Sequence, residues 1–312
     1  MIRAPAEERA ALTTRAALAS VGTASLLLVL KGYAAWITGS VAMLASLADT
    51  ALDVLSSLVT LLGVRVAAVP ADHDHRFGHG KAESLAALVQ VGIIAVSALG
   101  IAWRAIERLI VGAATAQAEY GIAVSAVAIA ATLALIAYQR SVIRRTGSIA
   151  IGTDRLHYQS DLALNLSVIA ALALDQYAGL TGADPLFGIA IAAWLLFGAW
   201  RASLQAVDQL MDKEWPPERR RAFVAVAARH PHGRGIHDLR TRSSGTQEFA
   251  QFHMWIDPAM TVAESHKVME EIETDLAREF PGVEVLIHLD PEGQVDQPDN
   301  PLAEADETKG LH

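Results

Sequence analysis

Two acidic side chains lie one helical turn apart inside an apolar stretch of the chain. Asp49 and Asp53 belong to the segment LADTALD, residues 47–53, within the apolar run 41–64. That run is long enough to cross a bilayer, and side chains at positions i and i+4 lie on the same face of a helix. A charged group at the bilayer centre costs on the order of 2.5–3.5 kcal/mol. The spacing therefore predicts a compensating partner, and a divalent cation is the obvious candidate.

A second apolar stretch contains the segment HYQSD, with His157 and Asp161 again four residues apart. If the two helices meet, they offer three carboxylates and one imidazole. Such nitrogen and oxygen donors suit a four-coordinate transition metal such as zinc, whereas all-oxygen sites suit magnesium, calcium or manganese. The alternative for either pair alone is an intramembrane hydrogen bond between helices, or a proton relay.

The loop after the second apolar run is dense in metal-ligating side chains. It reads PADHDHRFGHGKAE, residues 70–83, and holds Asp72, His73, Asp74, His75 and His79 within eight residues. A solvated loop seldom carries three histidines, so this composition predicts a second metal site. The alternative is a polar turn made flexible by its two glycines.

Four histidines and an aspartate recur along the C-terminal third of the chain. They are His237, His253, His266, His288 and Asp290. A single histidine is more often a surface or core residue than a ligand, but the group together predicts a cytoplasmic metal site of one or two ions. Alternation along a strand places His288 and Asp290 on the same side.

Composition separates a membrane part from an aqueous part. The chain has 312 residues, of which 52% are hydrophobic, and its net charge is -9. Because it has no cysteine, any metal must be held by His, Asp and Glu rather than by thiolates. The acidic balance and the lack of a basic stripe argue against binding to nucleic acid.

The sequence predicts six transmembrane helices followed by a small α+β domain. The expected spans are residues 16–37, 41–64, 84–103, 120–138, 157 or somewhat earlier to 177, and 185–200. The expected domains are a cytoplasmic N-terminal segment (1–14), a transmembrane domain (15–209), a cytoplasmic metal-binding regulatory domain (210–291) and a disordered acidic tail (292–312). Lys31 lies near the outer end of the first span, where a long side chain can reach the interface.

Basic residues fix the expected orientation. Lys and Arg gather in residues 1–15, 65–81 and 139–155, whereas the alternate connections hold only Arg104 and Arg108. The positive-inside rule therefore predicts that both termini are cytoplasmic.

The C-terminal domain shows the pattern α-β-β-α-β. The expected elements are a helix from Pro216 to about residue 230, strands at 236–242 and 247–257, a helix at 261–280 and a strand at 283–289. One apolar face of the second helix is expected to hold Val262, Met269, Ile272, Leu276 and Phe280. This order is compatible with a split-βαβ, metallochaperone-like sandwich.

Five motifs in this order resemble the cation diffusion facilitator family, in its bacterial zinc and ferrous-iron efflux branch. They are LADTALD, PADHDHRFGHGKAE, HYQSD, HDLRTR (237–242) and VLIHLDP (285–291). The resemblance covers residues 15–291 and implies a homodimeric, proton-coupled exporter in the bacterial inner (cytoplasmic) membrane, not an enzyme.

The resemblance also implies which residues hold metal. The transport site would use Asp49, Asp53, His157 and Asp161; the loop site Asp72, His75 and His79; and the cytoplasmic cluster His237, His253, His266, His288 and Asp290. His73 and Asp74 match no ligand position. The family further implies a charge interlock at the dimer contact, for which Lys81 and Asp212 occupy the matching positions.

The expected cargo is Zn2+, with Fe2+, Cd2+ or Co2+ as further candidates. Two other classes of function remain open from the residues alone. A membrane metallohydrolase would use the same ligands to activate water, although the chain has no H-E-x-x-H motif and no separate base. A metal sensor or scaffold would bind the ion and transport nothing.

Overall fold

The computed structural model describes residues 6–38, 41–111, 122–178, 183–245 and 247–293. The chain forms two compact units, one of residues 1–71 and 79–207 and the other of residues 72–78 and 208–312. Most of the predicted acidic tail, from residue 294 on, lies outside the described residues, as does Tyr120 at the predicted start of the fourth span.

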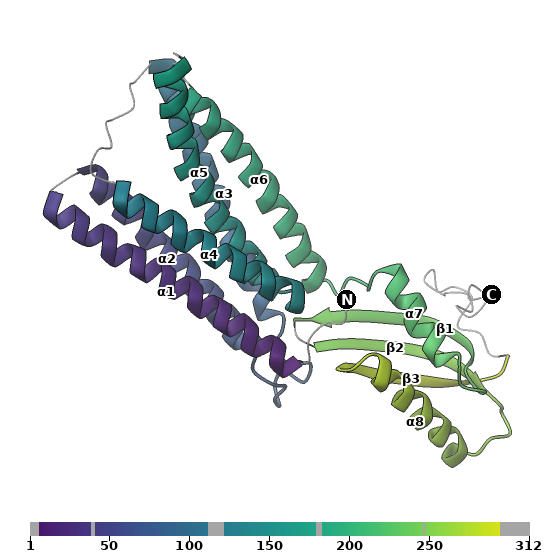
Figure 1. Cartoon of the computed structure of the whole chain (residues 1–312). Helices are drawn as coiled ribbons and strands as arrows, with labels where there is room; N and C mark the ends of the chain where they lie inside the picture. Colours follow the sequence, from purple (N-terminus) through teal and green to yellow (C-terminus); the bar gives the residue numbers. More distant parts are fainter. Residues whose placement is uncertain (1–5, 39–40, 112–121, 179–182, 246, 294–312) are drawn as a thin grey trace. The chain divides into compact units, whose positions relative to one another are not determined.

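All six predicted spans are long helices (Figure 1). They are α1 (Ala6–Thr38), α2 (Val41–Ala67), α3 (Ala82–Val111), α4 (Ile122–Thr146), α5 (Ile149–Ala178) and α6 (Ala183–Leu210). Five of them contain segments long and apolar enough to cross a membrane. The remaining helix, α5, is 30 residues long but more polar, because it carries the HYQSD segment and the charged residues Asp154 and Arg155.

The helices are longer than the apolar spans that the sequence predicts. Helix α1 has 33 residues, which corresponds to about 50 Å, whereas the hydrocarbon core of a bilayer is about 30 Å thick. Hydropathy detects only the apolar part, but backbone hydrogen bonding continues into the polar ends. Residues 6–14, expected as part of a separate N-terminal segment, are therefore helical.

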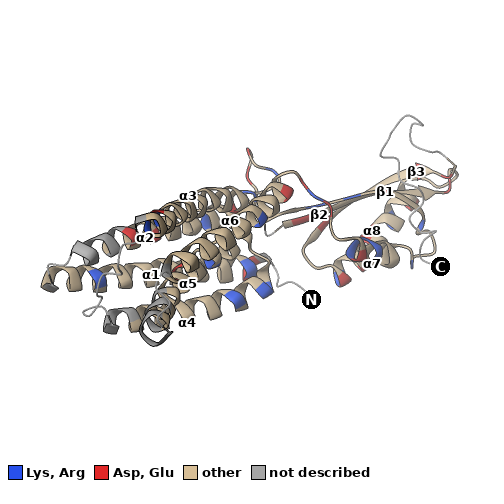
Figure 2. Ribbon diagram, turned by 90° about the horizontal axis from the view of Figure 1, so that it is seen from above, with Lys and Arg blue, Asp and Glu red and all other residues tan. Residues whose placement is uncertain are grey.

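Basic side chains gather at one end of the helical unit. Figure 2 shows Lys and Arg near the end where α1 begins and α4 ends. Arg65 lies in the last turn of α2, and Arg144 and Arg145 lie in the last turn of α4. Arg145 forms an ion pair with Glu8 of α1. This concentration of positive charge is typical of the cytoplasmic end of a membrane bundle.

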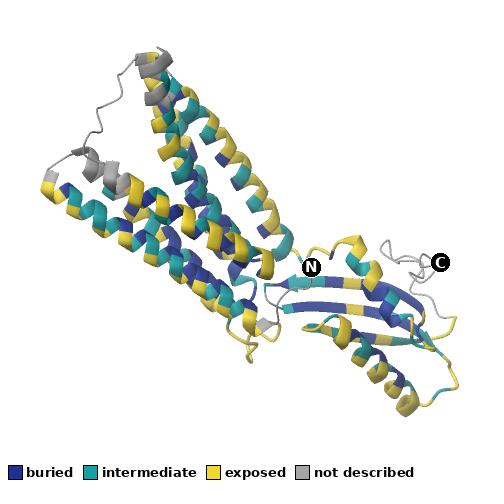
Figure 3. Ribbon diagram, in the orientation of Figure 1, coloured by how far each residue is buried: buried dark blue, intermediate teal, exposed yellow. Residues whose placement is uncertain are grey.

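Small residues let the helices approach closely. A Cβ atom added to Gly63 of α2 would lie 2.2 Å from Cβ of Ala86 on α3, so only glycine fits this contact. Gly198 of α6 contacts Leu156 of α5 in the same way, since an added Cβ would lie 2.8 Å from a Leu156 methyl group. Figure 3 shows that buried and exposed residues alternate along the bundle helices, as expected when one side of each helix contacts its neighbours.

The second unit corresponds to the cytoplasmic domain that the sequence predicts and is called the cytoplasmic unit below; it is a three-stranded sheet with two helices. Its elements are α7 (Pro217–Ala227), β1 (Arg234–Ser244), β2 (Gln247–Ile256), α8 (Val262–Glu279) and β3 (Val283–Pro291), in the sheet order β1-β2-β3. Strands β1 and β2 are antiparallel, and β2 and β3 are parallel with α8 as the crossover. This is the predicted αββαβ order, and each boundary lies within three residues of the prediction.

Helix α8 packs on the sheet through residues spaced by four. Val268, Ile272 and Leu276 are buried, whereas Val262 is 86% exposed. The prediction that Val262 belongs to the buried face is therefore wrong, because this first residue of α8 lies at the margin of the face. Thr261 caps the helix through a capping box with Glu264, and the pKa of Glu264 is lowered because its carboxylate accepts hydrogen bonds from Thr261.

We expect Leu276→Ala to destabilise the cytoplasmic unit by about 2–5 kcal/mol, because Leu276 is fully buried and its removal leaves a cavity. Hydrogen exchange of the β2 amides in the full chain measures this effect. Val262→Ala is the matched control, for which the change is expected to stay within about 0.5 kcal/mol. Equal effects of the two substitutions would contradict the packing.

Candidate metal sites

The first candidate site lies between α2 and α5. Nε2 of His157 lies 3.1 Å from Oδ1 of Asp53 and 3.9 Å from Oδ2 of Asp161. One ligand atom from each of these three residues lies within 4.8 Å of the others. His157 is buried and the two carboxylates are partly exposed. An imidazole nitrogen and two carboxylates at this separation can together coordinate one divalent cation.

Asp49, the fourth ligand predicted for this site, does not join the group. It lies one turn before Asp53 on α2 and its side chain is exposed; among the described residues the group consists of the other three. Four residues turn a helix by about 400°, so the two side chains diverge by about 40°. The rotation of α2 in this state directs Asp53, and not Asp49, toward His157.

Tyr158 holds α5 against its neighbours beside this site. Its hydroxyl donates a hydrogen bond to the backbone oxygen of Ser20 on α1, at 3.0 Å. The same hydroxyl lies 2.8 Å from Oγ of Ser57 on α2, from which it accepts. Because Tyr158 is 2% exposed, these bonds fix the rotation of α5 and with it the direction of His157.

A buried polar cluster lies one turn before His157, and the sequence analysis assigns it no role. The Asp154 carboxylate accepts hydrogen bonds from side chains on four other helices. The donors are Ser20 (α1), Thr60 (α2), Gln90 (α3) and Gln139 (α4). The spacing of Asp154, His157 and Asp161, three and then four residues, was the available signal, since it places all three on one face of α5.

Lys31 reaches inward rather than toward the interface. Its Nζ donates a hydrogen bond to Oγ1 of Thr50, at 2.7 Å. Thr50 lies between the two α2 aspartates and is buried. The Lys31 ammonium group therefore lies beside the helix face that carries the candidate metal ligands of α2. The sequence had predicted that this group reaches the outer membrane surface.

The loop residues lie close together, and a metal site formed by them stays a prediction. Ligand atoms of Asp72, His75 and His79 lie within 4.8 Å of one another. Asp72 organises the turn, because its Oδ1 accepts hydrogen bonds from the backbone amides of Asp74 and His75 at 3.0 and 2.6 Å. His73 and Asp74 are not in the group. The arrangement can hold an ion at an exposed position.

A third cluster lies on the sheet of the cytoplasmic unit. His237, His253 and His288 occupy facing positions on β1, β2 and β3. Oδ2 of Asp290 lies 2.9 Å from Nδ1 of His253 and 3.4 Å from Nε2 of His237, and these three residues form a group within 4.8 Å. His288 adds its Nε2 at 3.4 Å from the other Asp290 oxygen. A carboxylate between imidazoles suits one metal ion, or two that share Asp290.

The tautomer of His237 is suited to metal binding. Its Nδ1 donates a hydrogen bond to the backbone oxygen of Gly235, at 2.7 Å, so Nε2 keeps its lone pair. That Nε2 atom is buried and has no hydrogen-bond partner among the described residues. Gly235 has φ 56°, and an added Cβ would lie 2.2 Å from the Trp255 ring. Only glycine fits here, and it places its carbonyl oxygen where it accepts the Nδ1–H bond of His237. Metal-ligating histidines commonly donate their second ring N–H to a backbone carbonyl in this way.

Two further residues complete the comparison with the predicted cluster. His266 lies on the exposed side of α8, where its Nε2 is 3.4 Å from Glu270, and it does not join the group among the residues described. Asp238 was not predicted, although its Oδ2 lies 3.8 Å from Nε2 of His253. It follows His237 directly and has φ 49°, and its carboxylate also accepts two hydrogen bonds from Arg240.

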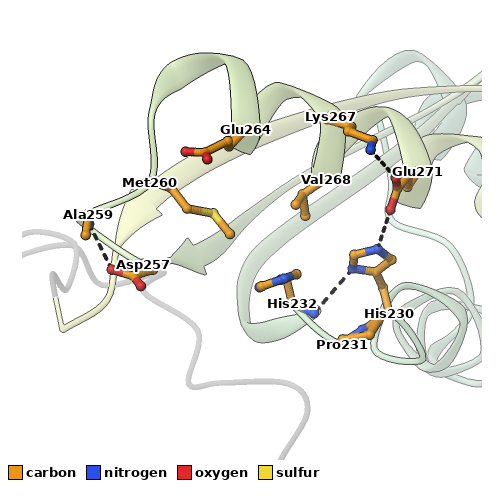
Figure 4. A pocket seen from close by; sticks show the side chains of 10 residues that line it. All are labelled: His230, Pro231, His232, Asp257, Ala259, Met260, Glu264, Lys267, Val268 and Glu271. Atoms are coloured by element: carbon orange, nitrogen blue, oxygen red, sulfur yellow. Dashed lines mark hydrogen bonds and ion pairs between the residues drawn. The ribbon is translucent and has the colours of Figure 1, made fainter.

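A cavity of about 530 Å³ lies elsewhere on the cytoplasmic unit (Figure 4). His230 and His232 line it with the acidic residues of α8. His230 is already engaged, since its Nδ1 accepts a hydrogen bond from the His232 amide and its Nε2 lies 3.0 Å from Glu271. The cavity contains none of the predicted ligands.

The interlock expected between Lys81 and Asp212 at a dimer contact stays a prediction. Within the cytoplasmic unit, Oδ2 of Asp212 lies 3.7 Å from Nη1 of Arg242.

Comparison with known proteins agrees with the motifs and the geometry. The cation efflux transmembrane domain matches residues 17–211, and the cytoplasmic domain of cation efflux proteins matches residues 215–292. The cation-efflux pump FieF of Cronobacter sakazakii is 44% identical over 280 residues, which is 90% of this chain and 93% of that protein. FieF of Escherichia coli O127:H6 is 42% identical over the same shares of the two chains.

Among solved structures, the metal-bound C-terminal domain of the CzcD transporter from Thermotoga maritima is 27% identical, with a TM-score of 0.24. The match covers 26% of this chain and 99% of that one. The two domain matches together span nearly all of the described residues and pair a transmembrane transport domain with its cytoplasmic partner domain. The chain therefore belongs to the cation diffusion facilitator family, in its bacterial cation-efflux branch, and is a membrane transporter rather than an enzyme.

Proposed function

We propose that the chain exports divalent metal cations from the cytoplasm in exchange for protons. The observation that best supports this proposal is the group Asp53, His157 and Asp161 within the transmembrane helices of a cation-efflux protein. Ionisable side chains inside a bilayer are costly, and they mark substrate and proton pathways.

Zinc fits the transport site best. The site combines one imidazole with carboxylates, and the chain has no cysteine. This donor set suits tetrahedral zinc and tolerates cadmium, cobalt and ferrous iron. Availability in the cell, as well as affinity, selects among these metals.

Metal and protons compete for the same atoms in this proposal. Nε2 of His157 and the carboxylates of Asp53 and Asp161 must be deprotonated to bind metal. An arriving ion therefore releases protons, and the site takes up protons again after the ion has left on the other side. Because the site holds either the metal or the protons, alternating access to the two sides of the membrane exchanges one for the other. The expected movement is a rocking of α2 and α5 against the other helices.

The direction of transport follows from the proposed orientation. Basic residues at the ends of α2 and α4 favour a cytoplasmic location of that side of the bundle. Both chain termini would then be cytoplasmic in the bacterial inner membrane. Metal would enter from that side and leave on the opposite one.

The cytoplasmic unit would act as a metal sensor in a homodimer. Metal bound to His237, His253 and Asp290 would stabilise the dimer and so bias the transport equilibrium, which is a linkage effect between two sites. The loop site of Asp72, His75 and His79 would contribute in the same way.

We expect Asp290→Ala to lower zinc binding by the cytoplasmic unit and to weaken transport only several-fold. Asp290 supplies the oxygen that joins His237 and His253, but it is no part of the transport site. Competition titration with a chelating dye and zinc flux in proteoliposomes measure the two effects. Asp275→Ala removes an exposed carboxylate on α8 and serves as the control. Complete loss of flux in Asp290→Ala would contradict a regulatory role.

The decisive test of the proposed function is zinc flux into proteoliposomes under an imposed pH gradient. We expect flux that follows the gradient and disappears when an ionophore collapses it. Zinc binding without flux would refute the exporter and favour a sensor. Flux that ignores the gradient would refute the exchange with protons.

A further inference from the structure

The Asp154 carboxylate is enclosed by neutral donors from four helices, α1 to α4. Its Oδ2 lies 2.6 Å from Oγ of Ser20 and 2.8 Å from Nε2 of Gln139. Its Oδ1 lies 3.1 Å from Nε2 of Gln90 and 3.4 Å from Oγ1 of Thr60. All five side chains are buried, and Asp154 itself is 0% exposed. The carboxylate therefore has hydrogen bonds but no access to water.

Among the residues that the structure describes, no cation forms an ion pair or a hydrogen bond with Asp154. On its own helix, Arg155 forms no ion pair with it, and Nε2 of His157 is directed to Asp53. On α3, Glu83 is bonded to Ser148 and to the Ala150 amide.

The remaining titratable or charged groups on the packed helices are engaged or distant. Tyr158 of α5 is bonded to Ser57 and Ser20, Lys31 of α1 is bonded to Thr50, and Arg140 of α4 is exposed. An unpaired charge in such surroundings is costly, and a buried group commonly takes up a proton instead.

The neighbours of Asp154 can satisfy either protonation state. Oγ of Ser20 lies 3.2 Å from the backbone oxygen of Ala16, and Oγ1 of Thr60 lies 3.4 Å from that of Ser56. Each hydroxyl can therefore donate to the Asp154 carboxylate, or turn to its own helix and accept the O–H of a protonated Asp154. The Oε1 atoms of Gln90 and Gln139 have no partner among the described residues, so a half-turn of either amide offers another acceptor.

We propose that Asp154 binds and releases a proton during the transport cycle, at a site separate from the metal ligands. The proposal rests on the proposed exchange of metal for protons. In the step itself, a hydronium ion of the aqueous phase loses the O–H bond that a carboxylate oxygen of Asp154 gains, and the carboxyl O–H bond breaks again when a water molecule takes the proton on release. No other covalent bond changes.

The position of Asp154 on α5 links its proton to the metal. It precedes His157 by three residues, which is about 4.5 Å along the helix axis. A divalent cation bound by His157 would favour the ionised form of a carboxylate one helical turn away, because screening by water is weak in the bundle. Metal binding would thus release a proton from Asp154 in addition to those of the ligands.

Infrared spectroscopy of the full-length protein tests this directly. A protonated carboxyl group has a carbonyl stretching band that a carboxylate lacks. We expect the zinc-minus-apo difference spectrum of the native protein to show loss of such a band, and we expect Asp154→Asn to remove part of this loss. Asp208→Asn, an exposed change at the end of α6, is the matched control and is expected to leave it intact. Superimposable spectra of native protein and Asp154→Asn would overturn the proposal.

A second variant keeps the test decisive if Asp154→Asn fails to fold. Gln139→Leu keeps Asp154 but removes one donor to its ionised form, so the band is expected to persist to a pH higher by roughly one unit. An unchanged pH dependence would overturn the proposal. The infrared measurement needs no transport, so it tests the role of Asp154 separately from the proposed function. If the native protein moved no zinc under a pH gradient, the proposed function would be refuted instead.

Discussion

Asp53→Ala is expected to reduce zinc flux in proteoliposomes to the background level. Among the α2 side chains that the structure describes, Asp53 alone belongs to the group that we propose as the transport site, and its carboxylate lies nearest to Nε2 of His157. Because Asp53 supplies one of the three ligand atoms of the group, its removal is expected to lower the metal affinity by roughly 100-fold, which corresponds to about 2.7 kcal/mol. Without this ligand the two helices no longer share the ion, so its binding cannot drive their movement.

Asp49→Ala is the informative comparison for this experiment. In this structure Asp49 is exposed and outside the group, so a smaller loss of flux is expected from its removal. An equally complete loss would mean that α2 rotates during transport and brings Asp49 to the ion, as the four-ligand prediction requires. Full flux in Asp53→Ala would contradict the location of the transport site.

His157→Asp is expected to shift the metal preference from zinc toward manganese. The substitution replaces the only imidazole of the site by a third carboxylate, and all-oxygen sites suit harder cations. We expect the ratio of zinc to manganese flux to fall by about tenfold or more, since a preference of about 1.4 kcal/mol already corresponds to that factor.

The flux ratio is best measured with both metals in the same proteoliposome preparation, which cancels differences in reconstitution. His230→Asp is the control, because His230 lies in the cavity of the cytoplasmic unit and not at the transport site. An unchanged ratio in His157→Asp would show that this imidazole does not set the selectivity.

Sequence patterns predict local pairs of ligands better than complete sites. The four-residue spacing of His157 and Asp161 indicates a shared helix face, and Nε2 of His157 does lie 3.9 Å from Oδ2 of Asp161. It could not tell whether Asp49 or Asp53 meets them, because the rotation of one helix against another depends on packing by residues such as Gly63 and Tyr158. Asp154 was missed for the same reason, since its four donors come from four different helices.

The fold followed from periodicity wherever one face of an element is buried. Alternation along β3 and the four-residue spacing on α8 predicted both elements, and β pairing then placed His237, His253 and His288 in one row. The ends of helices were harder to predict from the sequence. Val262 fits the apolar pattern but lies in the first turn of α8, and the polar ends of the bundle helices carry no hydropathy signal.

The polarity of α5 has a consequence for the biogenesis of the protein. A charged residue inside a span opposes its insertion, by up to about 2.5–3.5 kcal/mol at the centre, and α5 carries Asp154, Arg155 and Asp161 within eight residues of its first half. Such a segment is poorly suited to leave the translocon for lipid alone. The partners that bond Asp154 all precede it in the chain, on α1 to α4. During synthesis α1 to α4 are already present when α5 emerges. Their polar side chains can bind α5, whereas lipid offers no such hydrogen bonds.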